Sequence, residues 1–290
     1  MSEPNRKNTG LSPDQTLLRA DQVILPNLNG NTPSGLANYS GPLRIGVDLG
    51  TAFTVLAVLN EKGEPLVGEY QFTQVVRDGL VVDFMGAVII LEAMKKRIET
   101  KLGRLLTHAA SGFPPGVPDI EIRATANVVE AAGIQCSHLI DEPSAANNVL
   151  NLRDGAIVDI GGGTTGIAIL ENGEVVHTAD EATGGTHLSL VIAGAADLSF
   201  EEAEELKKDS SQQARLFPIV RPVMEKMGTI IEKHVRNKGV KSIILVGGTP
   251  LFPGIAKVIE EITGIPTQVP VNPLFVTPVG IAMEDRSELI

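Results

Sequence analysis

One short pattern occurs twice in this chain and constrains its fold more than any other feature. The first copy is Val47-Asp48-Leu49-Gly50-Thr51, and the second is Val158-Asp159-Ile160-Gly161-Gly162-Gly163-Thr164. Each copy ends one β-branched apolar run and precedes another, at residues 53–59 and 166–170, which predicts two strands joined by a glycine turn. The second aspartate follows the first by 111 residues. Two copies of one supersecondary unit predict two similar α/β lobes.

The residues around the two copies predict the rest of the α/β pattern. A helical stripe of apolar residues runs from Val88 to Leu105, and residues 106–111 read as a strand. Residues 122–132, 144–152 and 200–210 read as helices, and residues 242–246 as a buried strand. We expect a first lobe at residues 42–153 and a second at 154–290. A C-terminal helix near residues 278–284 can pack back onto the first lobe.

Residues 1–41 differ in composition from the remainder, because they are rich in Asn, Pro, Ser and Gly and their charges cancel. Apolar residues between 17 and 25 fall at helical spacing after Ser12-Pro13-Asp14, which can cap a helix. The composition favours a flexible N-terminal tail with a transient short helix. A short docking helix for a partner is the alternative.

The charge and the aromatic content exclude several function classes. The formal net charge is −11 and aromatic residues make up only 3% of the 290 residues. Nucleic-acid binding needs a basic face or stacking platforms, so we expect no nucleic-acid partner. No apolar run is long enough to span a bilayer and the N-terminus lacks a secretory pattern, so we expect no membrane association. The single cysteine, Cys136, fits a reducing, cytoplasmic compartment.

The glycine-rich turns provide another way to hold an anion. Glycine lets backbone N–H groups approach a phosphate closely, and the threonines of the two turns add hydroxyl donors. An aspartate at the end of each first strand suits Mg²⁺, which keeps several waters and takes few carboxylates. Two further glycine pairs occur at Gly184-Gly185 and Gly247-Gly248. Each pair alone is also ordinary turn chemistry.

Taken in order, these segments resemble the actin and DnaK-type ATPase superfamily. The matching segments are 46–51, 141–146, 159–164 and 245–249, and residues 76–84 are similar to the bacterial members MreB and FtsA. Residues 83–88, 113–116 and 180–187 further resemble the ethanolamine-utilisation EutJ family. The resemblance implies an actin-like ATPase fold, with two ribonuclease-H-like lobes around a nucleotide cleft. It also implies bacterial ethanolamine breakdown in a microcompartment and a chaperone-like accessory role on a protein partner.

The superfamily pattern implies ATP and Mg²⁺ as cofactors and assigns a role to each matching residue. Asp48 and Asp159 hold Mg²⁺ through water, and Glu142 orients or deprotonates the attacking water. The residues implied to bind phosphate are Gly50, Thr51, Gly161, Gly162, Gly163, Thr164, Gly184 and Gly185. Those implied to contact the nucleoside are Gly247, Gly248, Glu204, Lys207, Lys208 and Ser211. On local sequence alone, the helix of these last four is equally well a solvated charged face.

The chain also departs from the superfamily pattern. Thr165-Gly166 stands where DnaK relatives have Phe-Asp, Ala52 replaces a second threonine, and no lysine matches their catalytic lysine. These losses favour slow hydrolysis, and they leave open whether ATP is hydrolysed or only bound. A nucleotide-binding scaffold or assembly factor for microcompartment shell or lumen enzymes is the main alternative. Filament formation, as in MreB, and a small-molecule kinase are two more, and the oligomeric state stays open.

Overall fold

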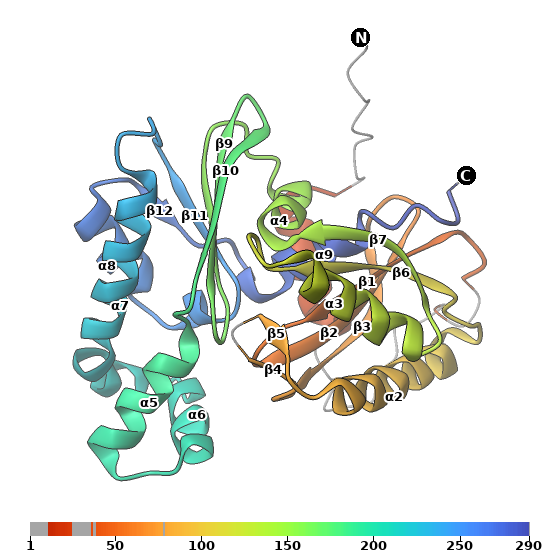
Figure 1. Cartoon of the computed structure of the whole chain (residues 1–290), viewed down its shortest axis with the longest axis horizontal. Coiled ribbons are helices and arrows are strands. Elements are labelled where there is room, and N and C mark those ends of the chain that lie inside the picture. Colours follow the sequence, from red (N-terminus) through yellow and green to blue (C-terminus); the bar gives the residue numbers. More distant parts are fainter. Residues whose placement is uncertain (1–10, 25–35, 37–38, 78, 290) are drawn as a thin grey trace.

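The computed structural model describes residues 11–24, 36, 39–77 and 79–289. Its strands form two separate five-stranded sheets, with helices on their outer faces and between them (Figure 1). The helices and strands are α1 (Pro13–Ile24), β1 (Leu43–Leu49), β2 (Phe53–Asn60), β3 (Pro65–Phe72), β4 (Val76–Arg77), β5 (Leu80–Val81), α2 (Phe84–Leu102), β6 (His108–Phe113), α3 (Asp119–Ala131), β7 (Gln135–Asp141), α4 (Glu142–Leu150), β8 (Gly155–Ile160), β9 (Thr165–Glu171), β10 (Glu174–Glu181), α5 (Gly185–Ala196), α6 (Phe200–Lys208), α7 (Gln213–Val235), β11 (Ile243–Val246), η2 (Thr249–Leu251), α8 (Ile255–Thr263), β12 (Thr267–Gln268), η3 (Pro273–Phe275) and α9 (Val276–Ala282).

The two sheets repeat one topology, as the duplicated pattern predicts. The first has the order β3-β2-β1-β6-β7 and the second β10-β9-β8-β11-β12. In each, an antiparallel meander of three strands is followed by two parallel strands reached through helical crossovers. Asp48 pairs with Val55 across the first hairpin, and Asp159 pairs with Gly166 across the second. The prediction of two similar α/β lobes is confirmed. The boundary that we expect between them, at residues 153 and 154, stays a prediction.

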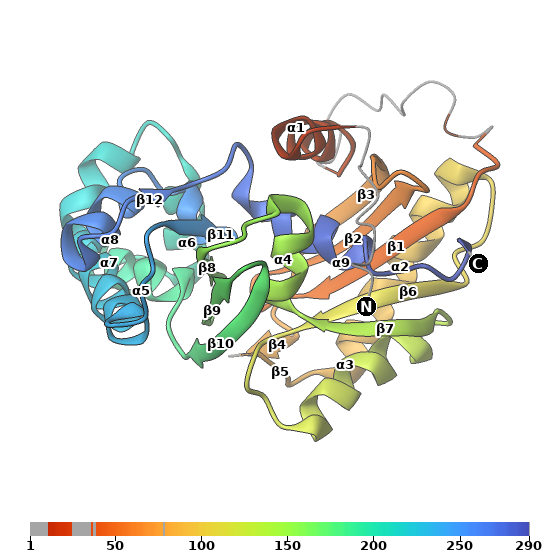
Figure 2. The same ribbon diagram turned by 90° about the horizontal axis from the view of Figure 1, so that it is seen from above.

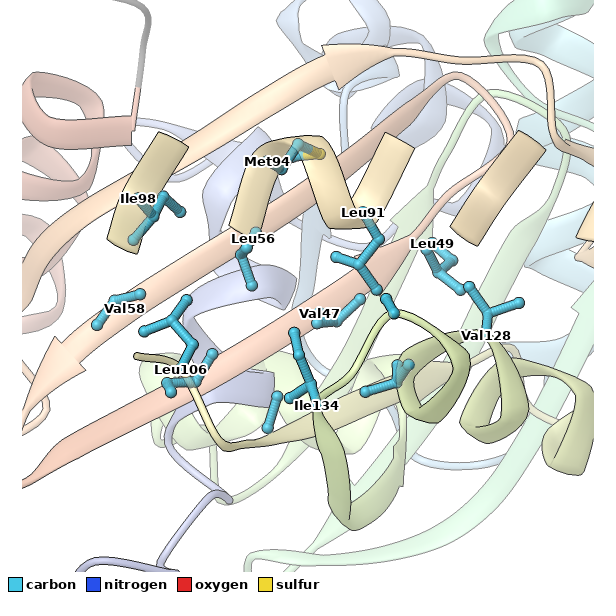
Figure 3. Close-up of a cluster of buried hydrophobic side chains, with 14 of the residues drawn as sticks. Val47, Leu49, Leu56, Val58, Leu91, Met94, Ile98, Leu106, Val128 and Ile134 are labelled. Atoms are coloured by element: carbon cyan, nitrogen blue, oxygen red, sulfur yellow. The ribbon is translucent and has the colours of Figure 1, made fainter. Parts of the chain in front are cut away.

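The first lobe buries its core between its sheet and the helices α2 and α3. Figure 3 shows Val47, Leu56 and Val58 of the sheet facing Leu91 and Ile98 of α2. The apolar stripe of α2 is therefore its buried face, as its spacing predicts. The stripe stops before Leu105, whose side chain is 68% exposed. Gly103 ends α2 in the left-handed conformation and turns the chain away, so the prediction for Leu105 is wrong.

A third apolar cluster lies between the two sheets and joins the lobes. It includes Val149 of α4, Val276 and Val279 of α9, and Ile157 of the second sheet. Helix α9 approaches the first lobe so closely that two glycines are needed. A Cβ on Gly280 would lie 1.8 Å from the Ala145 carbonyl oxygen, and one on Gly46 would lie 2.5 Å from the Ala282 nitrogen.

Residues 13–24 form a packed helix, which differs from the flexible tail that the composition favours. Helix α1 buries Leu17, Ala20 and Ile24 in the third cluster, and Figure 2 shows it beside β3, on the side where the lobes meet. Ser12 accepts a hydrogen bond from the Gln15 amide and caps the helix. The amphipathic spacing therefore outweighed the polar composition. Residues 1–10, 25–35 and 37–38, which carry the rest of the predicted tail, lie outside the described residues.

Candidate functional site

A cavity of about 430 Å³ lies where the glycine turns of the two lobes face each other. Its volume is in the range of small-molecule and cofactor sites. The predicted residues that line it are Asp48, Gly50, Thr51, Glu142, Asp159, Gly161, Gly162, Gly163, Thr164, Gly185, Glu204, Lys207, Lys208, Gly247 and Gly248. Gly184 and Ser211 are outside this lining. Fifteen of the seventeen predicted site residues, drawn from both lobes, therefore line one cavity.

Three acidic side chains meet in this cavity from three different elements. Asp48 lies near the end of β1, Asp159 near the end of β8, and Glu142 is the first residue of α4. Asp141 caps α4 by accepting a hydrogen bond from the Ser144 amide at 3.0 Å, which fixes the direction in which the helix starts. The equivalent strand ends of the two lobes thus bring both repeated aspartates to one place, with Glu142 beside them.

Burial and mutual repulsion raise the pKa values of these acids. Burial, and then the charge of Asp159, raise the pKa of Asp48 to about 7. Burial raises the pKa of Asp159 to about 6, although a hydrogen bond from Thr277 Oγ1 at 2.5 Å lowers it. The pKa of Glu142 is raised well above its ordinary value, mainly by burial and then by Asp48 and Asp159. A bound cation would offset the repulsion among the three carboxylates and favour their ionised forms.

The donor set fits a hydrated Mg²⁺ ion. Carboxylate oxygens are the ligands that this ion prefers, and it keeps several waters when few carboxylates are offered. Within the described part of the chain, no three His, Cys, Asp or Glu side chains are arranged to hold a metal ion directly. Asp48 and Asp159 are therefore suited to hold such an ion through its waters rather than by full coordination.

The glycine turns of the second lobe are held to one another by hydrogen bonds. The Gly161 carbonyl accepts from Thr249 Oγ1 at 2.7 Å and from the Gly185 amide at 2.9 Å. A Cβ on Gly184 would lie 2.6 Å from the Gly162 carbonyl oxygen, so Gly184 allows its segment to pack closely against the Gly161-Gly162 turn. Three separate segments thus form one rigid surface with backbone amide donors, which suits an anion.

Helix α6 contributes a charged wall to the cavity. Lys207 Nζ lies 2.5 Å from Glu204 Oε1, 2.8 Å from Ser189 Oγ and 3.1 Å from the Gly185 carbonyl oxygen. Burial is the main reason why the pKa of Lys207 is lowered. The alternative of a fully solvated face is wrong for Glu204, which is 6% exposed. Ser211 lies past the helix end, where its hydroxyl donates to Asp209 at 2.7 Å.

Several lining residues were not anticipated from the sequence. They come from α1, from β2 and β3, from η2, and from the residues around the start of α9: Asp21, Phe53, Tyr70, Thr249, Asn272, Phe275 and Thr277. Thr249 follows a glycine pair and could have been found by that signal. The others carry no local motif. Asp21 and Asn272 are joined by a hydrogen bond between distant segments, and Phe53, Tyr70 and Phe275 pack in one aromatic cluster.

The departures from the superfamily pattern are visible in the structure. Thr165 Oγ1 donates to the Thr183 carbonyl at 2.7 Å and is buried. Gly166 beside it has no side chain, so neither residue offers a carboxylate to the cavity. The lysines among the lining residues of the described chain are Lys207 and Lys208, both on α6. No lysine of the first lobe is among these lining residues.

The two-lobed fold with this cleft defines an actin-like ATPase fold. MreB 5 of Spiroplasma citri superimposes with a TM-score of 0.69 at 17% identity, covering 86% of this chain and 97% of that chain. The family model described as type IV pilus assembly protein PilM matches residues 82–280. Both likenesses define the class of fold.

Closer relatives define the family. The ethanolamine utilization protein EutJ of Escherichia coli is 42% identical over 274 residues, which cover 92% of this chain and 96% of that protein. The crystal structure of EutJ from Carboxydothermus hydrogenoformans matches with a TM-score of 0.83 and 42% identity, over 93% of this chain and 98% of that chain. This chain belongs to the ethanolamine utilization protein EutJ family, which confirms the resemblance found in its motifs.

Proposed function

We propose that this chain binds ATP with Mg²⁺ between its two lobes and hydrolyses it slowly. The observation that carries the proposal is the convergence of Asp48, Glu142 and Asp159 on one cavity whose walls are glycine turns from both lobes. An acidic cluster alone would repel a nucleotide. Backbone amides and a cation between the acids and the phosphates make the same cavity suitable for one.

The chemistry of the proposed reaction falls to few groups of this chain. Glu142 would orient the attacking water and accept its proton at a carboxylate oxygen, a role that suits a buried acid with a raised pKa. Bound Mg²⁺ would supply charge neutralisation at the phosphates. The absence of a carboxylate at Thr165-Gly166 and of a first-lobe lysine among the lining residues of the described chain supports slow turnover.

The family supports a role in ethanolamine utilization. The EutJ proteins of Escherichia coli and Salmonella typhimurium carry that pathway in their names. We propose that this chain is a cytoplasmic, chaperone-like accessory protein that acts on a protein of the pathway or of its microcompartment. Closure of lobes 42–153 and 154–290 on the nucleotide would be the motion transmitted to that partner. The net charge of −11 argues against nucleic acid as the partner.

Glu142→Gln tests the proposed hydrolysis. The amide cannot accept a proton, so single-turnover phosphate release should fall at least 100-fold while ATP affinity changes by less than about threefold. Unmodified protein should release phosphate at about 1 s⁻¹ or slower. Glu171→Gln, at an exposed position on β9, is the matched control and should behave as unmodified protein. Undiminished hydrolysis in Glu142→Gln, or release faster than a few per second, would contradict the assignment.

A scaffold that binds ATP without hydrolysing it is the second candidate. The buried, hydrogen-bonded Thr165 favours it, because the chain has a structural threonine hydroxyl near the position where DnaK relatives place a carboxylate. In that case ATP with Mg²⁺ would raise the melting temperature, yet no phosphate would be released over many hours.

A further inference from the structure

Lys208 reaches from the second lobe to two aromatic rings of the first lobe. It is the last residue of α6, and Figure 1 places α6 in the second lobe, across from β2 and β3. The Lys208 ammonium lies 5.7 Å from the centre of the Phe53 ring and 5.3 Å from that of Phe72. Both distances are within the range of cation–π attraction.

The two consecutive lysines of α6 have different surroundings. Lys207 turns inward and donates to Glu204, Ser189 and the Gly185 carbonyl, all in its own lobe. Lys208 is paired with Glu205 at 3.0 Å and lies 4.0 Å from Glu204, both on its own helix. Neighbouring residues on a helix point about 100° apart, which leaves the end of Lys208 facing the other lobe.

The rings under Lys208 belong to a packed aromatic cluster. Phe53 lies 5.3 Å from Tyr70 and 5.7 Å from Phe72, and Tyr70 lies 6.0 Å from Phe275, all between ring centres. These four residues are a large share of a chain with eight phenylalanines and two tyrosines. Because the rings brace one another, their faces are held in place to receive a cation. Phe53 also lies two residues after Thr51 and lines the same cavity, so the contact adjoins the proposed phosphate site.

We propose that Lys208, Phe53 and Phe72 form a latch that holds the lobes closed and slows the release of bound nucleotide. The proposal rests on the proposed nucleotide binding and gives Lys208 a different task from the nucleoside contact that the resemblance implies. Lys208 is then a positioning residue, which acts through lobe closure. Loss of an exposed cation–π contact should change the closure equilibrium or the nucleotide release rate by about two- to fivefold.

Four variants test whether Lys208 and the aromatic rings hold the lobes closed. Lys208→Met keeps the length of the side chain and removes its charge, and Phe72→Leu removes the ring face. The double variant tests whether the two act together, and Phe72→Trp supplies a stronger cation acceptor. Lys101→Met and Phe84→Leu are the matched controls. Lys101 is 40% exposed and pairs with one carboxylate at 3.1 Å, against 41% and 3.0 Å for Lys208. Phe84 is 39% exposed, as is Phe72.

The first measurement is the release rate of a fluorescent ATP analogue in the presence of Mg²⁺. Lys208→Met and Phe72→Leu should each speed release about two- to fivefold, and the double variant should add little to either. Phe72→Trp should slow release, and both controls should match unmodified protein. Acceleration in Lys208→Met without any effect at position 72 would overturn the latch, because it would make Lys208 a direct nucleotide ligand.

The second measurement reports closure without nucleotide, which separates failure of the latch from failure of nucleotide binding. Spin labels at Ile89→Cys on α2 and Leu190→Cys on α5, in a Cys136→Ser background, give the distance between the lobes; both positions are more than half exposed. Lys208→Met and Phe72→Leu should lengthen or broaden this distance relative to the two controls. Distances that match the controls would overturn the latch even if the analogue never binds. A longer distance without analogue binding would support the latch and contradict the proposed function.

Discussion

At the scale of single residues, Gly247 shows how closely the site is built. Its φ of +91° belongs to the left-handed region that side chains rarely adopt. A Cβ at this position would also lie 2.4 Å from Asp159 Oδ1 and 2.6 Å from the Ile160 carbonyl oxygen. Glycine is therefore required both by the backbone conformation and by the space next to one of the repeated aspartates.

Gly247→Ala should lower the free energy of unfolding by about 1–3 kcal/mol, through backbone strain and through displacement of Asp159. It should also weaken ATP binding. Gly239→Ala is the matched control, because Gly239 has a φ of +68° with open space around its Cβ position. Gly239→Ala should lower the free energy of unfolding by about 1 kcal/mol and leave ATP binding intact. Urea unfolding and nucleotide titration measure both quantities. Equal effects of the two variants would contradict the close approach to Asp159.

Sequence alone could place most of the site because its residues sit in local motifs. Asp48 and Asp159 lie near the ends of strands and Glu142 starts a helix, and such positions can be predicted from the spacing of apolar residues and glycines. Ser211 lies past the end of α6 and is not among the lining residues, and the sequence does not show which way such a residue faces. Tyr70 and Asn272 could not be predicted, because they reach the cavity through contacts between segments far apart in the chain.

At the scale of elements, helix α1 is an integral part of the lobe junction. Arg19 Nε donates to the Pro65 carbonyl of β3 at 2.6 Å, and Asp21 accepts from the Asn272 side chain at 2.7 Å. These contacts connect the helix to the first lobe on one side and to the segment before α9 on the other. Loss of the helix would therefore affect both lobes.

Two adjacent leucines test this packing. Leu17 is fully buried, whereas Leu18 is 48% exposed. Leu17→Ala should destabilise the protein by about 2–5 kcal/mol, because it leaves a cavity in the cluster between the sheets. Leu18→Ala should change stability by less than about 0.5 kcal/mol. Both are measured by urea unfolding. Similar small effects would mean that residues 13–24 behave as the flexible tail that composition favours.

The segment after α9 is joined to the first sheet by a buried acid. Asp285 is 0% exposed and accepts hydrogen bonds from the Ile45 amide at 2.9 Å, His108 Nδ1 at 2.7 Å and Ser137 Oγ at 2.9 Å. The hydrogen bond to Asp285 is the main reason why the pKa of His108 is raised. Burial raises the pKa of Asp285, but its hydrogen bonds outweigh burial and lower it overall.

This pair makes stability depend on pH. Because the folded pKa of His108 is raised, this residue makes its full contribution to the free energy of unfolding below its unfolded pKa of 6.5. That contribution is lost as the pH rises through the folded pKa. Because the folded pKa of Asp285 is lowered, its contribution to the free energy of unfolding is present above its unfolded pKa of 3.8. It is lost as the pH falls through the folded pKa. Unmodified protein should therefore lose urea resistance as the pH rises above 6.5. Asp285→Asn should lower the free energy of unfolding by about 2 kcal/mol, and this free energy should change less with pH above 6.5. An equally steep loss in Asp285→Asn would exclude this pair as the cause.

The elements differ in how far sequence could predict them. The hairpins were predictable because their apolar runs are bounded by glycine turns. Strand β7 was missed, since most of its residues are only half-buried and show no apolar alternation. Helix α7 spans Gln213–Val235 with Pro218 and Pro222 inside it, and proline normally signals a helix end. Its buried stripe, which includes Val220, Met224 and Ile231, holds the helix through both prolines.

At the scale of the whole molecule, the negative net charge and the duplicated strand–turn unit together determine how an anion could be bound. A net charge of −11 gives the protein no general attraction for a polyanion. The duplicated unit instead brings two aspartates and two glycine turns to one cavity between the lobes. In the described part of the chain, no helix has the length and hydrophobicity needed to cross a bilayer. An anionic nucleotide would then depend on amide donors and on a cation, so its binding should depend on Mg²⁺.

Calorimetric titration of ATP, with excess Mg²⁺ and again with EDTA, tests this central claim most directly. We predict measurable binding heat with Mg²⁺ and none with EDTA, together with loss of the Mg²⁺-dependent heat in Asp48→Asn. Titration of EDTA-treated protein with Mg²⁺ alone serves as the blank. Absence of heat and of any melting shift with ATP and Mg²⁺, or equal affinity in EDTA, would contradict the account.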